Sequence, residues 1–174
     1  SPYGCSKGAA DQYVIDYANI YNLNTTSFRQ SCIYGPNQLG VEDQGWVAWF
    51  TIAYALNKKI FVYGNGKQIR DVLHVDDLLN AYFLCFKNKK KSKGNAYNIG
   101  GGYKNTLSLL ELIRMLNKEF KIEKNIQKKG WRPGDQKVFI SNNEKFISHT
   151  GWEIKNNSSL GILNLIKWVK SKDK

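Results

Sequence analysis

Apolar residues recur along the chain at helical or strand spacing, and they predict an alternation of helices and strands. The first stripe has a period of three to four residues over 8–21, which is the spacing of one helix face. A polar break at 22–24 precedes a β-favouring segment, 25–33, which we interpret as a buried strand. The turn signal of Tyr34, Gly35 and Pro36 ends it. The chain is therefore predicted to begin with a helix followed by a strand.

The alternation continues to the C-terminus. We predict helices over 46–56, 75–86, 108–120 and 142–150, a last helix capped by Ser159, and strands over 60–63, 96–99 and 138–140. Ser108 and Glu111 have the spacing of a capping box at the start of a helix. The lysine-rich run 87–93 is predicted to be a loop. This order indicates the α/β fold class.

Composition is that of a globular protein, with 42% hydrophobic and 23% charged residues in a chain of 174. The formal charge of +12 raises the question of a nucleic-acid partner. Only four of the 26 basic residues are Arg, and the lysines are scattered among many asparagines. We interpret them as a solvated surface, and predict no nucleic-acid partner.

Cysteine usage and hydropathy indicate the compartment. Cys5, Cys32 and Cys85 form no C-x-x-C pair and are odd in number, which argues against a disulfide framework or a zinc site. We therefore predict no metal and a reducing, cytoplasmic location. No leader and no membrane-spanning run is apparent, so no membrane partner is predicted. Because the chain begins with Ser, directly at the motif described next, we expect a fragment of a longer protein.

Tyr3 and Lys7 are the first candidates for chemistry. Residues four apart at the start of a helix lie on one face, which brings a phenol close to an ammonium group. A fixed cation favours the phenolate form of a tyrosine, which can then take a proton from a sugar hydroxyl. The spacing alone occurs often by chance, and a surface helix pair is the alternative.

The segment 1–7, SPYGCSK, resembles the catalytic segment of the extended short-chain dehydrogenase/reductase family, which includes nucleotide-sugar epimerases and dehydratases. The resemblance implies that Tyr3 is the general acid/base and that Lys7 holds the phenolate and the nicotinamide ribose, so both residues would also bind the cofactor, NAD. It further implies the C-terminal part of a Rossmann-type doubly wound sheet plus a smaller mixed α/β substrate-binding region.

The same resemblance implies a division of the chain. Residues 1–36 would end the dinucleotide-binding domain, and 37–174 would form mostly the nucleotide-sugar-binding domain, with some segments returning to the Rossmann sheet. The turn at 98–102 has the wrong spacing for a dinucleotide-binding G-x-G-x-x-G fingerprint, so no phosphate loop for NAD is expected in this chain. A homo-oligomer is expected when the protein is full length.

Residues 28–36 resemble the strand and turn that lie beneath the nicotinamide in this family. The resemblance implies that Ser31 contacts the cofactor and Cys32 the substrate. Many relatives carry Asn beside this turn, whereas Cys32 and Ile33 occupy it here, so a contact from Asn to the sugar cannot be carried over. A small core residue is the alternative interpretation of Cys32.

Two arginine motifs follow. Residues 64–77 resemble the family's Gly-rich turn and Arg-Asp motif, which implies that Arg70 grips the nucleotide diphosphate. A guanidinium offers a planar fork to two phosphate oxygens, which an ammonium cannot. Residues 131–136 resemble the Arg-x-Gly-Asp segment, with Arg132 toward phosphate and Asp135 toward ribose hydroxyls, although a surface turn is the alternative. We assign Asp71 and His74 to packing and to the start of a helix.

Residues 43–50 and 64–68 resemble the CDP-paratose 2-epimerases within that family, although an aromatic core helix would also explain the tryptophans. The resemblance implies conversion of CDP-paratose to CDP-tyvelose, in the biosynthesis of surface-polysaccharide (O-antigen) sugars, by transient oxidation at C2 with NAD. Alternatives are another nucleotide-sugar 4-epimerase or 4,6-dehydratase, and an inactive basic binding fragment. The chain alone is expected to be inactive.

Overall fold

The largest sheet is built around the strand β4, Ile69–His74. In this computed structural model, which describes residues 1–124 and 126–172, β4 pairs in parallel with β2 (Cys32–Tyr34) and β8 (Val138–Phe139) and antiparallel with β6 (Thr106–Ser108). Successive side chains of a strand point to opposite faces. Accordingly Val72 packs into one hydrophobic cluster and Leu73 into the other. The strand β4 therefore joins the two cores.

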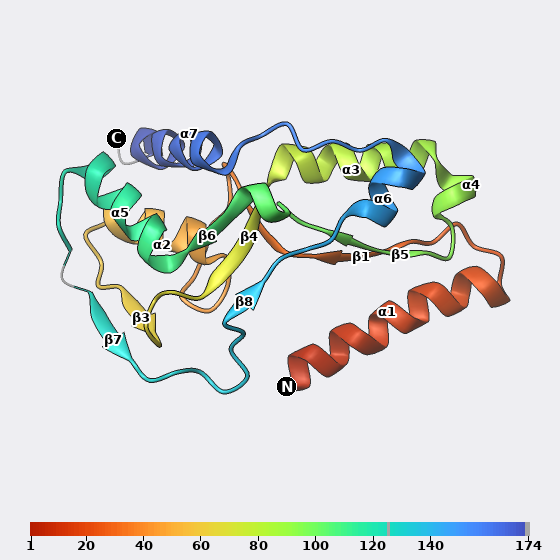
Figure 1. The fold of residues 1–174 in the computed structure, drawn as a ribbon, viewed down its shortest axis with the longest axis horizontal. Coiled ribbons are helices and arrows are strands. Elements are labelled where there is room, and N and C mark those ends of the chain that lie inside the picture. Colours follow the sequence, from red (N-terminus) through yellow and green to blue (C-terminus); the bar gives the residue numbers. More distant parts are fainter. Residues whose placement is uncertain (125, 173–174) are drawn as a thin grey trace.

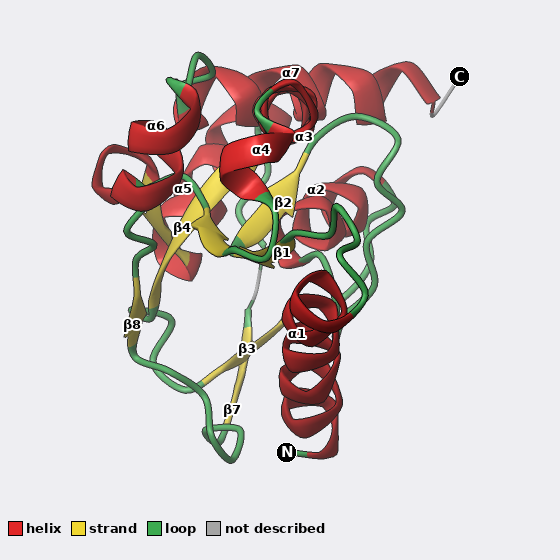
Figure 2. Ribbon diagram, turned by 90° about the vertical axis from the view of Figure 1, so that its right-hand side faces the viewer, coloured by secondary structure: helices red, strands yellow, loops and turns green. Residues whose placement is uncertain are grey.

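The smaller parallel sheet consists of β1 (Ser27–Gln30) and β5 (Ala96–Ile99). Figures 1 and 2 show it between α3 (Val75–Lys87) and α1 (Pro2–Ile20). The second core cluster lies here and includes Phe146 of α6 (Glu144–Thr150). The α/β prediction is confirmed, with parallel sheets covered by helices.

The predicted strand over 25–33 is wrong in one respect, because the chain forms two strands in different sheets. The backbone N–H of Ser31 still donates to the Ile99 carbonyl of the smaller sheet, at 2.9 Å. One residue later, Cys32 pairs with Val72 of β4. The change of partner occurs inside one β-favouring segment, so the residue pattern shows no boundary.

The larger core is enclosed by α2 (Trp46–Ala55), α5 (Leu109–Phe120) and α7 (Ser158–Lys172), with the parallel pair β3 (Phe61–Tyr63) and β7 (Gln127–Lys129) beside it. A short 3₁₀ helix, η1, covers Tyr103–Asn105. The capping box of Ser108 and Glu111 is present as predicted. The helix α7 begins at Ser158, so Ser159 lies inside it and is not its cap.

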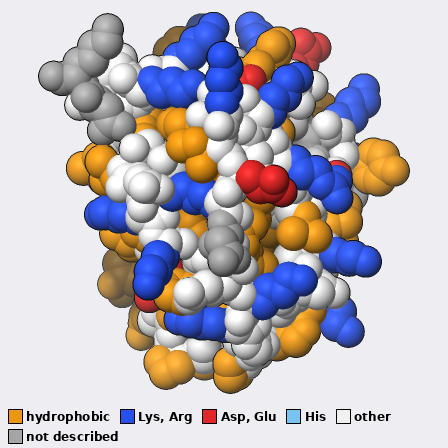
Figure 3. Space-filling model, turned by 90° about the vertical axis from the view of Figure 1, so that its left-hand side faces the viewer, with side chains coloured by type: hydrophobic (Ala, Val, Ile, Leu, Met, Phe, Trp, Pro, Cys, Tyr) orange, Lys and Arg blue, Asp and Glu red, His pale blue; other side chains and the backbone are white. Residues whose placement is uncertain are grey.

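The lysine-rich run was predicted to be a loop, and this is wrong, because Lys89–Ser92 forms the single helical turn α4. The Ser92 hydroxyl donates to the Cys85 carbonyl at 3.1 Å, which fixes this turn against the end of α3. Figure 3 shows one face of the molecule, on which Lys and Arg side chains are spread among apolar ones. Among the residues that the structure describes, no helix has the length and apolar character needed to cross a membrane.

Candidate functional site

The four side chains assigned to the substrate line one cavity of about 210 Å³, called here the arginine pocket. Cys32 comes from β2, Arg70 from β4, and Arg132 and Asp135 from the loop between β7 and β8. The remaining lining residues are Glu42, Asp43, Gly45, Trp46, Phe50, Phe61, Tyr63, Gln68 and Leu109. Segments more than 100 residues apart in sequence thus form a single wall.

Each arginine of the pocket is held by a carboxylate. Nη2 of Arg70 lies 2.8 Å from Oδ1 of Asp135, and Nη2 of Arg132 lies 2.9 Å from Oδ1 of Asp43. The Arg70–Asp135 pair is largely buried, whereas the Asp43 side chain is 85% exposed. An incoming anion would exchange with carboxylates that already orient the two guanidinium groups.

Tyr63 is fixed on three sides. The Arg132 guanidinium carbon lies 3.9 Å from the centre of its ring, within the range of a cation–π contact. Its hydroxyl donates to Oε1 of Glu42 at 3.0 Å, and its carbonyl accepts from Nε2 of Gln68 at 2.8 Å. Tyr63 is therefore a rigid aromatic wall of the arginine pocket.

Gly64 allows the loop that carries Arg132 to approach this wall. It has a φ of +73°, and a Cβ atom there would lie 2.6 Å from the ring of Trp131. A side chain at position 64 would therefore both strain the backbone and displace Trp131. The Gly-rich turn is needed for the close approach of the 130–135 loop.

Cys32 contacts the arginine pocket and also packs against the larger core. The indole N–H of Trp46 donates to its Sγ at 3.3 Å. Burial raises the pKa of the Cys32 thiol, so the group stays protonated at neutral pH. It can shape the pocket wall, and it is not suited to act as a nucleophile.

Tyr3 and Lys7 lie together in the first two turns of α1, which begins at Pro2, six residues before the predicted start at residue 8. The helix is capped by the hydroxyl of Ser1, which accepts from the Gly4 N–H at 3.1 Å, and Pro2 fits its first turn. Nζ of Lys7 lies 5.6 Å from the centre of the Tyr3 ring. Both residues line an open cleft of about 810 Å³ between α1 and β1, separate from the arginine pocket.

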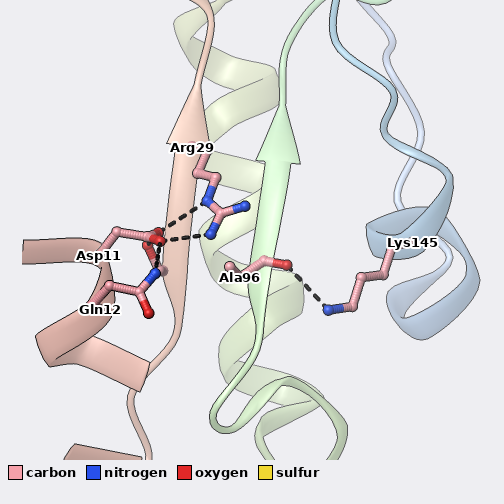
Figure 4. Close-up of polar contacts among 6 residues, drawn as sticks. Asp11, Gln12, Arg29, Ala96 and Lys145 are labelled. Atoms are coloured by element: carbon pink, nitrogen blue, oxygen red, sulfur yellow. Dashed lines mark hydrogen bonds and ion pairs between the residues drawn. The ribbon is translucent and has the colours of Figure 1, made fainter. Parts of the chain in front are cut away.

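An ion pair that sequence reasoning missed ties α1 to β1 (Figure 4). The guanidinium of Arg29 donates from Nε and Nη2 to the two carboxylate oxygens of Asp11, at 3.1 and 2.6 Å. The Ser27 hydroxyl also donates to Asp11. The Arg29 guanidinium holds the pKa of the Asp11 carboxyl below its usual value. Arg29 is therefore structural, and it helps to place the helix that carries Tyr3.

Ser31 lines neither the cleft nor the arginine pocket, because its hydroxyl donates to Asp71. Asp71 is fully buried and also accepts from the N–H groups of Gly102 and Ser141, at 3.0 and 3.1 Å. The predicted role of Asp71 in packing is therefore incomplete, because its carboxylate holds four segments of the chain together. Its partners are 31–70 residues away in sequence, so no local pattern indicates them.

Three further pocket residues, Glu42, Tyr63 and Gln68, were missed as binding candidates. Two sequence features could have indicated them: the acidic pair that precedes the helix from Trp46, and the tyrosine that precedes the turn at Gly64. Within the described residues, no group of three or more His, Cys, Asp or Glu side chains could hold a metal ion. The polar groups that line the arginine pocket and the cleft with Tyr3 include guanidinium, carboxylate, phenol, ammonium, amide and thiol groups.

Comparison with known proteins gives a consistent picture. The sequence model of the NAD-dependent epimerase/dehydratase family matches residues 1–100. A CDP-paratose 2-epimerase from Salmonella typhi is 44% identical over 98% of this chain and 52% of its own length. Two solved structures, each 28% identical, are a UDP-glucose 4-epimerase from Thermotoga maritima with UDP-glucose (TM-score 0.87) and a dTDP-glucose 4,6-dehydratase from Bacillus anthracis with NAD (TM-score 0.83).

The chain spans about half the length of the curated relatives that it matches. The likeness to the UDP-glucose 4-epimerase covers 100% of this chain and 55% of that structure. The likeness to the dTDP-glucose 4,6-dehydratase covers 99% of this chain and 53% of that structure. The chain therefore has the fold of one half of these Rossmann-type enzymes, as the sequence resemblance implied.

Proposed function

The chain belongs to the NAD-dependent epimerase/dehydratase family, and from this premise we propose that the full-length protein that carries it epimerises a nucleotide-diphosphate sugar. The more specific proposal is conversion of CDP-paratose to CDP-tyvelose at C2, for surface-polysaccharide synthesis in the cytoplasm. The observation that carries it is the 44% identity to a CDP-paratose 2-epimerase along almost the whole chain. A homo-oligomeric state when full length is part of the same proposal.

The arginine pocket supports the nucleotide-diphosphate part of the proposal. Arg70 and Arg132 would hold the diphosphate through charge-assisted hydrogen bonds, and Asp135, once released from Arg70, would accept from ribose hydroxyls. Cys32 would line the wall nearest the substrate without a direct polar role. This assignment explains why arginines occur at these positions in a chain that otherwise uses lysine.

The cleft between α1 and β1 suits NAD at its nicotinamide end. An exposed phenol and an ammonium group 5.6 Å from its ring are a fitting set for a ribose hydroxyl and a reacting sugar hydroxyl. NAD, when bound, supplies hydride removal from the sugar carbon and hydride return. Tyr3 would take the proton from the sugar hydroxyl and give it back, and Lys7 would favour its phenolate form. Ser31, engaged with Asp71, would contribute backbone contacts at most.

A 4,6-dehydratase is the second candidate, favoured by the likeness to the Bacillus anthracis enzyme. The two reactions are separated by incubating the full-length protein with NAD and either CDP-paratose or dTDP-glucose, and reading the products by NMR. We expect CDP-tyvelose from the first substrate and no 4-keto-6-deoxy sugar from the second. The opposite result would replace the epimerase proposal with the dehydratase.

Replacing Arg70 by lysine should weaken CDP-sugar binding, because one point donor replaces a two-pronged fork. We expect a loss of about 1–3 kcal/mol, the usual range for hydrogen bonds to charged groups. Calorimetric titration of the full-length protein with CDP would measure it. Arg114→Lys, which alters the one arginine outside the family motifs, is the matched control and should leave the affinity unchanged. Unchanged affinity in folded Arg70→Lys protein would make the motif structural.

The 174-residue chain expressed alone should neither retain NAD nor epimerise CDP-paratose. The smaller sheet has two strands, and the flanking helices expose large apolar side chains, among them Tyr13 (66%) and Phe86 (73%). Exposed apolar surface of this kind favours association, so we also expect aggregation or binding of hydrophobic dyes. Mass spectrometry for co-purified NAD and an assay with CDP-paratose would test this. Stoichiometric NAD with turnover would contradict it.

A further inference from the structure

Glu42 differs from the other carboxylates of the arginine pocket. Asp43 and Asp135 are each paired with an arginine, whereas no described Lys, Arg or His side chain forms an ion pair with Glu42. The residues that line the pocket include two arginines and three carboxylates, so the lining carries one negative charge in excess. The nearby Lys129 ammonium donates to the Tyr63 hydroxyl at 3.4 Å and forms no ion pair with Glu42. A pocket for a diphosphate would not gain affinity from this extra anion, so Glu42 calls for a different explanation.

The backbone around Glu42 forms a hydrogen-bonded turn. Val41 and Gln44 exchange two backbone hydrogen bonds, at 2.9 and 3.0 Å, which close a tight turn with Glu42 and Asp43 at its tip. The Tyr63 hydroxyl donates to Oε1 of Glu42 at 3.0 Å. One carboxylate oxygen is thus fixed by the aromatic wall of the pocket, and the other has no protein donor among the described contacts.

From this arrangement, and resting on the proposed function, we infer that Glu42 selects nucleotides whose base carries an exocyclic amino group, as cytosine does. A carboxylate can only accept hydrogen bonds, and the 4-amino group of cytosine donates one. Uracil and thymine present a carbonyl oxygen at the same ring position, which a carboxylate repels. The residue would therefore combine an attraction to one base with a repulsion of its competitors, which is how specificity is commonly built.

The Glu42→Gln variant tests this inference. Glutamine retains an oxygen to accept from Tyr63, and its amide can donate to the carbonyl of uracil. Calorimetry on the full-length protein would give the affinities for CDP and for UDP at one salt concentration. We expect wild-type protein to prefer CDP by about tenfold or more, and Glu42→Gln to bring the ratio close to one or to invert it.

Asp43→Asn is the matched control, because it removes the same charge from the adjacent residue, whose carboxylate is paired with Arg132. It should alter CDP and UDP affinity by the same factor and leave their ratio unchanged. The wild-type ratio tests the inference even if Glu42→Gln does not fold, as judged by circular dichroism. Equal affinity of wild type for both nucleotides overturns the inference and leaves the proposed function standing. Absence of binding by either nucleotide to folded wild-type protein overturns both.

Discussion

Replacing Tyr3 by phenylalanine in the full-length protein is expected to lower kcat by about 100- to 10,000-fold, the usual contribution of general acid/base catalysis. The ring remains beside Lys7, at the wall of the cleft between α1 and β1, and only the proton acceptor is lost. Substrate affinity should change little. Steady-state turnover of CDP-paratose, together with calorimetric titration of CDP, would separate the two effects.

Tyr13→Phe is the matched control for Tyr3→Phe. Tyr13 is on the same helix and similarly exposed, at 66% against 68%, but it does not line the cleft that contains Tyr3 and Lys7. Its replacement should leave kcat unchanged. If Tyr3→Phe retains turnover within a factor of two of wild type, Tyr3 has no part in the mechanism.

The second large effect is expected for stability, from Asp71→Ala. Removing this buried carboxylate leaves the N–H groups of Gly102 and Ser141 without their acceptor, whereas the Ser31 hydroxyl can still donate to the backbone carbonyl of residue 71. Each buried donor left unsatisfied costs about 1–3 kcal/mol, so for two donors we expect the free energy of unfolding to fall by about 2 kcal/mol or more. Urea unfolding of the full-length protein, followed by tryptophan fluorescence, would measure the loss.

Asp76→Ala provides the comparison for Asp71→Ala. Asp76 is 69% exposed in the first turn of α3, where an acidic residue contributes less than about 1 kcal/mol through the helix dipole. A loss for Asp71→Ala no larger than that for Asp76→Ala would show that Asp71 does not hold the four segments together.

Local sequence patterns predicted most helices correctly, because amphipathic spacing and capping are properties of neighbouring residues. The capping box at Ser108 and the helix from Val75 are examples. These patterns did not predict the central strand β4 or the short strands β6 and β7. The split of 25–33 between two sheets could not be predicted, since it depends on strands β4 and β5, which come much later in the chain. The helical turn at 89–92 also has a distant partner, because the Thr26 hydroxyl donates to the Ser92 carbonyl at 2.9 Å.

The candidate site, like the fold, could be predicted from the sequence only in part. Arg70, Arg132 and Asp135 could be named in advance because each belongs to a recognisable motif, and the fold brings them into one cavity. The pairing of each pocket arginine with a carboxylate, and the lack of an ion pair for Glu42 among the described residues, are relations between distant segments. Such contacts form only in the assembled fold, so composition and residue spacing do not predict them.

The strand β4 has a consequence for how this protein can diverge. Five consecutive residues meet five different demands: Arg70 lines the pocket, Asp71 joins segments, Val72 and Leu73 fill separate cores, and His74 caps α3. An insertion or deletion here would shift all five at once. The loops at 37–45 and 130–137 reach the same pocket and carry few buried residues. Lineages that acquire new sugars or bases are therefore expected to vary these loops and to keep the length of β4 constant.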